Sequence, residues 1–128
     1  MQDRPNAAEL AEAVREFIET EILPTISDPR LRFRALVAAN GLGILEREIA
    51  LGAPLVRREV GSLARLLGRA DALPDDLEEL RRRAVDLNRE LAQRIRAGDT
   101  PDGTLAHCLA TVADKLRVAS PRYLERYR

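Results

Sequence analysis

The chain has 128 residues, a length typical of one domain, and its 45% apolar content excludes an intrinsically disordered protein. Its 21 basic and 21 acidic residues give zero net charge, which argues against a nucleic-acid-binding protein, since such domains are strongly basic. No apolar run reaches the roughly 20 residues that span a bilayer, and no signal peptide or lipidation motif is present. We therefore expect a soluble cytoplasmic protein that binds neither nucleic acid nor membrane.

The charged residues are distributed unevenly along the chain. Residues 1–28 contain seven acidic side chains and two arginines, whereas residues 29–69 contain eight arginines and three glutamates. Because opposite charges attract, we expect these two segments to face each other or a second copy of the chain.

The first predicted helix spans about residues 7–23. Asn6 is a suitable N-cap, and Glu9, three residues later, completes a capping box. Apolar positions recur on one side of this helix, and Pro24 ends it. An acidic stripe on the other side consists of Glu9, Glu12, Glu16 and Glu19.

Two predicted helices follow, separated at Gly52. The start signal Asp28-Pro29 predicts a helix over about residues 29–51. Gly52 is a stop signal, and the proline two residues later is a restart signal, which predicts another helix over about residues 54–67.

The segment 35–45 is apolar except for Asn40, and its small residues form one helical face. Ala35, Ala39 and Gly43 recur at every fourth position, so a neighbouring helix backbone can approach them closely. We expect this segment to be the central and most buried part of the protein.

The second half of the chain contains the clearest periodic pattern. Apolar residues at near-heptad spacing predict a helix with a buried seam over residues 75–97. After a turn, a helix is expected over about residues 104–118, and residues 122–128 form a last helical turn. The apolar side of the 104–118 helix, expected to face inward, consists of Leu105, Cys108, Leu109, Val112 and Leu116.

These elements predict an all-α fold with no strand. The short connections favour antiparallel neighbours. We therefore expect residues 1–128 to form a single-domain up-and-down bundle of four to five helices with a short C-terminal helical turn.

Asn40, Arg47 and Glu48 form a candidate polar patch. A buried amide must be hydrogen-bonded, so Asn40 either bonds a neighbouring helix or lies at the bottom of a pocket. Arg47 and Glu48 follow about two turns later on a similar face, although they can equally form a surface pair.

Arg58, Arg65 and Arg69 form a candidate anion-binding stripe. A guanidinium offers a planar fork of donors that suits phosphate or carboxylate. The same arginines can instead pair with the acidic stripe of the first helix, and we favour this pairing because the charges balance.

The sequence contains no complete catalytic or metal-binding constellation. His107 and Cys108 are adjacent, so on a helix they diverge, with Cys108 on the apolar side and His107 pointing away from it. No second histidine and no C-x-x-C motif is present, so we expect no metal, no cofactor and no catalytic residue. Lys115 is the only lysine beside 20 arginines, and its identity reflects either a role or chance.

The C-terminal segment is a candidate interface. Tyr123 and Tyr127 are four residues apart and are flanked by arginines, beginning with Arg122. Tyr and Arg are enriched in interface hot spots. This tail either docks on its own bundle or contacts another subunit.

Several short motifs carry a family resemblance that covers nearly the whole chain. They are Gln2-Asp3-Arg4-Pro5, Ala8-Glu9-Leu10, Arg32-Phe33, Ala38-Ala39-Asn40, Leu45-Glu46-Arg47-Glu48, Lys115-Leu116 and Ser120-Pro121-Arg122-Tyr123. With these motifs the chain resembles an uncharacterised bacterial family of small all-helical proteins. Genes of that family lie near those of aminoglycoside-phosphotransferase-like kinases and acyl-CoA dehydrogenases. The resemblance implies an accessory role near such enzymes and supplies no catalytic residues.

Three functional hypotheses follow from these observations. The leading one is a non-catalytic, self-associating interaction protein that supports a kinase-like or acyl-CoA-metabolising enzyme. The alternative is a binder of a small anionic ligand, an acyl-CoA or a nucleotide, held by Arg47, Arg58 and Arg65. An enzyme that uses Glu48, His107 or Lys115 would require these groups to converge in one cleft.

Overall fold

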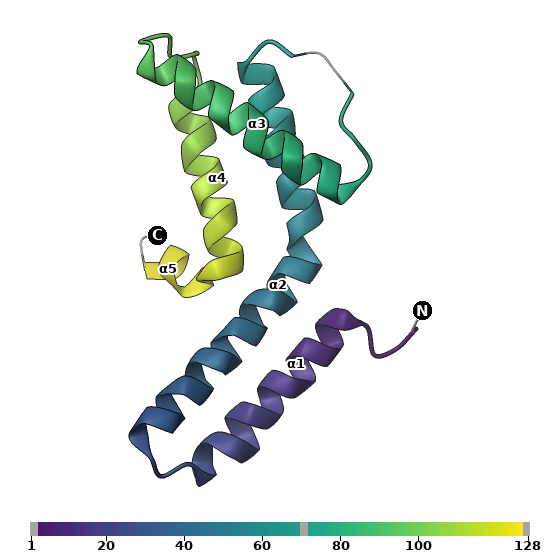
Figure 1. Ribbon diagram of the computed structural model, residues 1–128, viewed down its shortest axis with the longest axis vertical. Helices are drawn as coiled ribbons and strands as arrows, with labels where there is room; N and C mark the ends of the chain where they lie inside the picture. Colours follow the sequence, from purple (N-terminus) through teal and green to yellow (C-terminus); the bar gives the residue numbers. More distant parts are fainter. Residues whose placement is uncertain (1–2, 70–71, 127–128) are drawn as a thin grey trace.

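The computed structural model describes residues 3–69 and 72–126, and helices joined by turns make up most of them (Figure 1). The described residues contain no strand, which confirms the all-α prediction. None of the described helices is both long and apolar enough to cross a membrane. The helices are α1 (Ala7–Phe17), the π-helical turn η1 (Ile18–Ile22), the 3-10 turn η2 (Leu23–Thr25), α2 (Pro29–Leu66), α3 (Leu77–Arg96), α4 (Thr104–Ala119) and α5 (Pro121–Arg126).

The other long helices all pack on helix α2, and they use different parts of it. Helix α1 returns alongside its first half, while α3 and α4 pack against its second half (Figure 1). Within the described residues, α1 contacts neither α3 nor α4. The helices therefore all pack on α2, but α1 does not pack with α3 and α4 around one core.

The predicted starts of the first two helices are confirmed by the capping geometry of α1 and α2. The Asn6 side chain accepts hydrogen bonds from the backbone N–H groups of Ala8 and Glu9, and the Glu9 carboxylate accepts one from the Asn6 N–H at 2.7 Å. The Asp28 carboxylate similarly accepts from two N–H groups at the start of α2, where Pro29 is the first residue. These side chains satisfy donors that a helix N-terminus leaves without partners.

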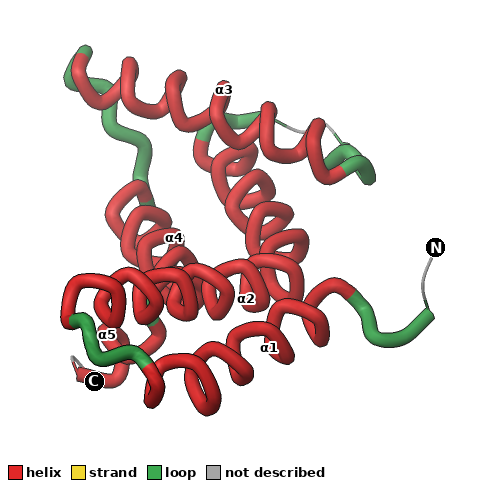
Figure 2. The backbone as a smooth tube through the Cα atoms, turned by 60° about the horizontal axis from the view of Figure 1, so that its bottom comes forward, coloured by secondary structure: helices red, strands yellow, loops and turns green. Residues whose placement is uncertain are grey.

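The predicted break between residues 51 and 54 is wrong, because α2 runs without interruption from Pro29 to Leu66. Pro54 lies inside the helix, where it removes one backbone hydrogen bond at a cost of about 3 kcal/mol. The helix accommodates it by changing direction along its length, as both ribbon views show (Figure 2). Packing of α3 and α4 on the segment beyond Pro54 offsets this cost. Helix propensity depends on each residue alone, so it could not reveal this packing with distant helices.

The small-residue face of α2 is buried against α1, and the other sides of this segment are exposed. Ala39 is 1% exposed, and the Arg15 side chain lies 3.4 Å from where a Cβ on Gly43 would be. Asn40 is exposed, and so are Phe33 and Val37 on the outer side of the helix. The prediction that this segment is the most buried in the protein is therefore wrong, since only one helix covers it.

The hydrophobic core lies between α3 and the second half of α2. The near-heptad seam predicted for residues 75–97 supplies half of it, and residues beyond Pro54 in and just after α2 supply the rest. Leu63 and Val60 are 0% exposed. The core consists of Val60, Leu63, Ala64, Leu67, Leu80, Ala84, Leu87 and Leu91, with Val56 and Leu73 packed against it.

Helix α4 is oriented opposite to the prediction. The residues turned toward α2 include Thr104, His107 and Asp114, all of which are buried. The apolar side expected to face inward is largely in solvent, with Leu105 73% and Leu109 63% exposed. The reason is that His107 and Asp114 find their partners Ser62 and Arg58 on α2, so this side of α4 turns toward α2 and the opposite side turns outward.

The core position Leu63 should govern stability. We expect Leu63→Ala to lower the free energy of unfolding by about 2–5 kcal/mol, because it removes a fully buried side chain and leaves a cavity. Leu105→Ala is the matched control and should change it by less than about 0.5 kcal/mol. Urea denaturation followed by circular dichroism measures both, and equal effects of the two substitutions would contradict this assignment of the core.

Candidate functional site

Polar side chains form a seam where α2, α3 and α4 meet, and Glu59 is its centre. Its Oε1 atom accepts a hydrogen bond from Asn88 Nδ2 of α3 at 2.8 Å and lies 3.5 Å from Lys115 Nζ of α4. The Glu59 side chain is only 13% exposed, so its charge requires these partners. A single carboxylate of α2 thus connects the other two helices.

Asp114 is the second carboxylate of the seam and is also nearly buried. Its side chain is 11% exposed and lies 3.4 Å from the Nε atom of Arg58 on α2. Arg117, one turn later on α4, donates a hydrogen bond to its other oxygen. Two guanidinium groups therefore balance one buried carboxylate, and the Arg58 contact connects α4 to α2.

Glu48 extends the seam toward the middle of α2. Arg81 of α3 donates a hydrogen bond to its carboxylate at 3.1 Å. Gly52 makes room for this arrangement, since a Cβ at that position would lie 2.8 Å from Glu48 Oε1. A glycine inside a helix is unfavourable by itself, and here it has a packing function.

A cavity of about 330 Å³ lies beside this seam, between α2 and α4. Leu55, Val56 and Val118 line it together with Glu48 and the charged residues of the seam. Glu48, Glu59, Asp114 and Lys115 on its wall are all held in ion pairs within the chain. Among the described residues, no group of three His, Cys, Asp or Glu side chains has the arrangement of a metal site. The charged groups on the cavity wall are therefore already partnered within the chain, and the rest of the wall is mostly apolar.

His107 lies apart from this cavity, buried between α4 and α2. Its Nδ1 atom is 2.9 Å from the Ser62 hydroxyl of α2. Burial lowers the pKa of His107, a nearby Glu59 charge opposes this shift, and Lys115 adds to it. His107 lines a separate groove with Arg65 and is not a wall residue of the cavity. Glu48 and Lys115 line the same cavity and His107 does not, so the structure does not bring together in one cleft the three groups that the enzyme hypothesis requires.

The predicted position of His107 and Cys108 on α4 is reversed. His107 is 7% exposed and faces α2, while Cys108 is an exposed free thiol. The two residues do diverge as expected, so they form no dyad.

The candidate polar patch is divided between two places. Asn40 and Arg47 line a groove of about 570 Å³ between the α1–α2 pair and the start of α5, together with Arg122. Glu48 is on the wall of the cavity instead. The Nε atom of Arg47 donates to the Val118 carbonyl at 2.6 Å, so Arg47 ties α2 to the end of α4.

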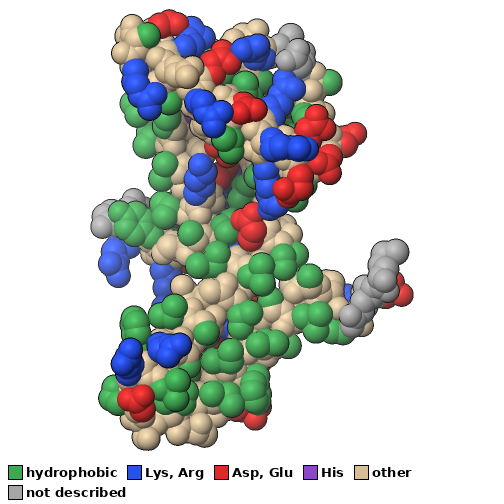
Figure 3. Space-filling model, viewed as in Figure 1, with side chains coloured by type: hydrophobic (Ala, Val, Ile, Leu, Met, Phe, Trp, Pro, Cys, Tyr) green, Lys and Arg blue, Asp and Glu red, His purple; other side chains and the backbone are tan. Residues whose placement is uncertain are grey.

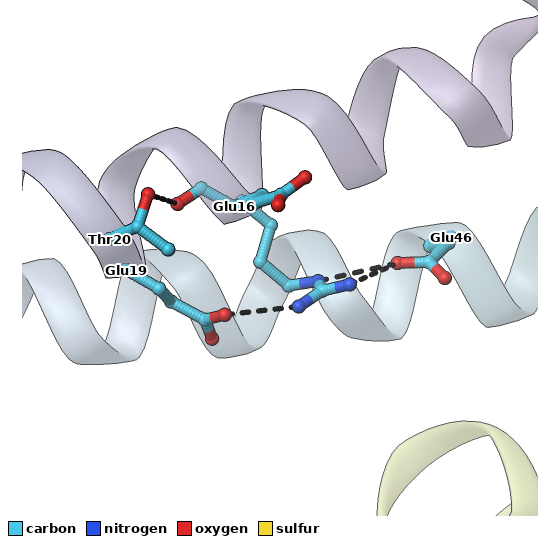
Figure 4. A network of polar contacts seen from close by, with 5 residues as sticks. Glu16, Glu19, Thr20 and Glu46 are labelled. Carbon is cyan, nitrogen blue, oxygen red and sulfur yellow. Dashed lines mark hydrogen bonds and ion pairs between the residues drawn. The ribbon is translucent and has the colours of Figure 1, made fainter.

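Arg15 closes one side of this groove with two ion pairs. It reaches from α1 between Glu19 of the same helix, at 3.0 Å, and Glu46 of α2, at 3.3 Å (Figure 4). In this contact α1 supplies the arginine and α2 the glutamate. This is the reverse of the expected pairing, in which acidic residues of the first segment face arginines of the second.

The candidate anion stripe is also divided. Arg58 pairs with Asp114 of α4, and Arg69 pairs with Glu90 of α3 at 2.6 Å. Arg65 lines the groove beside His107. The predicted pairing of these arginines with the acidic stripe of α1 is wrong, because α1 packs on the other half of α2.

The C-terminal candidate interface is described only in part. Tyr123 is 50% exposed, and Arg122 is exposed and lines the groove of about 570 Å³. Tyr127 lies outside the described residues.

Sequence reasoning did not identify Glu59, Asn88, Asp114 and Ser62 as seam residues. A signal was present on α4, where polar residues recur three and four positions apart and so form one side of the helix. These residues are Thr104, His107, Thr111 and Asp114, and the structure shows them buried or half-buried.

Comparison with protein families places the chain in a family that has no assigned activity. Residues 24–123 match the family model described as "Domain of unknown function (DUF6285)", and the chain therefore belongs to that family. No curated protein and no solved structure shows a significant match. The matched region covers α2, α3 and α4, so it includes the whole polar seam.

The buried His107 should make stability depend on pH. Its folded-state pKa lies below the ordinary 6.5, so the unfolded chain binds the proton more readily as the pH falls. We expect the free energy of unfolding to fall between pH 7.5 and pH 5.5, and to fall less in His107→Gln. Urea denaturation at both pH values measures this difference, and parallel pH profiles for the two proteins would contradict a buried neutral histidine.

Proposed function

We propose that this DUF6285 protein is a non-catalytic helical interaction protein that binds another polypeptide through apolar surfaces its own fold leaves uncovered. The observation that carries the proposal is the outer side of α4. Leu105, Leu109 and Val112 are 73%, 63% and 54% exposed, and Cys108 lies among them. We call these four residues the α4 stripe.

The spacing of the α4 stripe is that of a helix-packing surface. Its members recur three and four residues apart, so they form one continuous row along the helix. A contiguous exposed apolar row of this kind is typical of a surface that binds a protein partner, since scattered apolar residues are the norm elsewhere.

The pairing of charges around the cavity supports the same proposal. Glu48, Glu59 and Asp114 on its wall each pair with a basic side chain of this chain, and Arg47, Arg58 and Arg65 lie in three different places. A small anionic ligand would therefore need a different set of residues. The alternative of an acyl-CoA or nucleotide binder would use the groove lined by Arg15, Arg47 and Arg122.

The family resemblance indicates which partners to test first. We propose an aminoglycoside-phosphotransferase-like kinase or an acyl-CoA dehydrogenase, encoded near the gene, as the polypeptide that covers the α4 stripe. An accessory role fits a chain that leaves the apolar α4 stripe exposed while the ionisable groups around its cavity are paired within the chain.

Substitution within the α4 stripe tests the proposal directly. We expect Leu109→Arg to abolish co-elution with the co-expressed partner in size-exclusion chromatography, because a buried unpaired charge opposes association. Ala110→Arg adds the same charge at the next exposed position, outside the stripe, and should leave co-elution unchanged. If neither candidate partner co-elutes with the native chain, or if both substitutions weaken co-elution equally, the proposal fails.

A further inference from the structure

The first half of the molecule carries a second apolar surface, and we propose that a second copy of this chain packs on it. This surface belongs to the α1–α2 hairpin and is distinct from the α4 stripe. The inference rests on the proposed function in one respect, since both assign exposed apolar faces to protein contacts.

Helix α1 contributes one row of this surface. Leu10, Val14 and Phe17 are 44%, 50% and 49% exposed and recur at positions i, i+4 and i+7. This row lies beside the α1 residues that pack on α2, so α1 has one apolar side covered and another open. The glutamates Glu12 and Glu16 occupy the remaining side.

Helix α2 contributes the matching row. Leu31, Leu45 and Ile49 are 50%, 49% and 44% exposed and share one side of the helix. The Arg15 side chain lies against both Gly43 and Glu46, so Val14 is level with Leu45 in the antiparallel pair.

The two rows adjoin on one face of the hairpin. Arg15 and Glu19 line the groove beside α5 together with Asn40 and Arg47, so that groove occupies the other face. Figure 3 shows apolar side chains over α1 and the first half of α2, while charged side chains gather over α3 at the opposite end. We call Leu10, Val14, Phe17, Leu31, Leu45 and Ile49 the hairpin face.

The size of the hairpin face suits a dimer. Six roughly half-exposed side chains leave on the order of 500 Å² of apolar surface outside, if each retains about half of its full area. Two such faces packed together would bury about 1,000 Å², the lower bound for a specific interface, before any flanking polar contact is added. The α4 stripe is smaller, because its four residues all lie on one helix.

A twofold axis parallel to the helices describes this packing. It places α1 of one copy over α2 of the other, so that Val14 of one copy meets Leu45 of the second copy. All neighbouring helices are then antiparallel, which also suits their dipoles.

The hairpin face is tested by the mass of the full chain in solution. Sedimentation equilibrium should give twice the chain mass of 14.3 kDa for the native protein. Val14→Arg and Leu45→Arg should each give a monomer with unchanged helical circular dichroism, because both positions are about half exposed in one copy. Leu109→Arg is the matched control and should remain a dimer.

A cysteine experiment tests the predicted pairing without introducing charge. In a Cys108→Ser background, a mixture of Val14→Cys and Leu45→Cys chains should form mixed disulfide dimers on oxidation, in several-fold excess over either variant alone. Dimers of one variant only, or no cross-linking, would overturn the proposed arrangement.

The outcomes separate this inference from the proposed function. A native chain that is monomeric at micromolar concentration, or a dimer broken by Leu109→Arg and not by Val14→Arg, would overturn the hairpin face as a dimer interface. Loss of partner co-elution on Leu109→Arg, with the dimer intact, would still support the proposed function. A stable dimer that binds no candidate partner would support only the inference made here.

Discussion

The continuity of α2 through Pro54 is the constraint on which the rest of this structure depends. Every other long helix packs on α2, and α1 is separated from α3 and α4 because it occupies a different half of that helix. A break at Gly52, which the local sequence favours, would leave no common support. The helix persists because its second half is buried against α3 and anchored to α4 by Glu59 and Arg58.

The polar seam determines which surfaces remain open. Since α4 turns its hydroxyl, imidazole and carboxylate groups toward α2, its leucines have to face solvent. Burial of an ion pair contributes little net stability but fixes orientation, because the opposite rotation of α4 would take the buried Asp114 away from Arg58 of α2. The same contacts thus set the orientation of α4 and leave the α4 stripe exposed.

Much of the fold was predictable from the sequence, because local signals determined it. The capping box at Asn6 and Glu9, the Asp28-Pro29 start and the heptad-like seam around Leu87 rely on neighbouring residues, and the structure confirms them. The face of α4 was not predictable in this way. Its periodic pattern contains an apolar side and a polar side, and only the partners Ser62 and Arg58, some 45 and 56 residues away in the chain, decide between them.

The candidate site residues were less predictable than the fold for the same physical reason. Asn40, Arg47 and Glu48 share a face on an isolated helix, but the arrival of α5 on one side and α3 on the other separates them. The distribution of charges along the sequence likewise did not indicate which half of α2 would pack against α1. Contacts between distant segments, and not local periodicity, place Glu59 at the centre of the seam.

Helix α4 packs through its polar side and leaves its apolar side open in the isolated protein. The reaction rate of the Cys108 thiol with a maleimide, measured on the native purified chain, decides whether this orientation is right. We expect a rate close to that of the urea-unfolded chain, and a lower rate when the partner is bound. A native thiol that reacts only as fast as the chain unfolds would show that the apolar side of α4 is buried, contrary to this orientation.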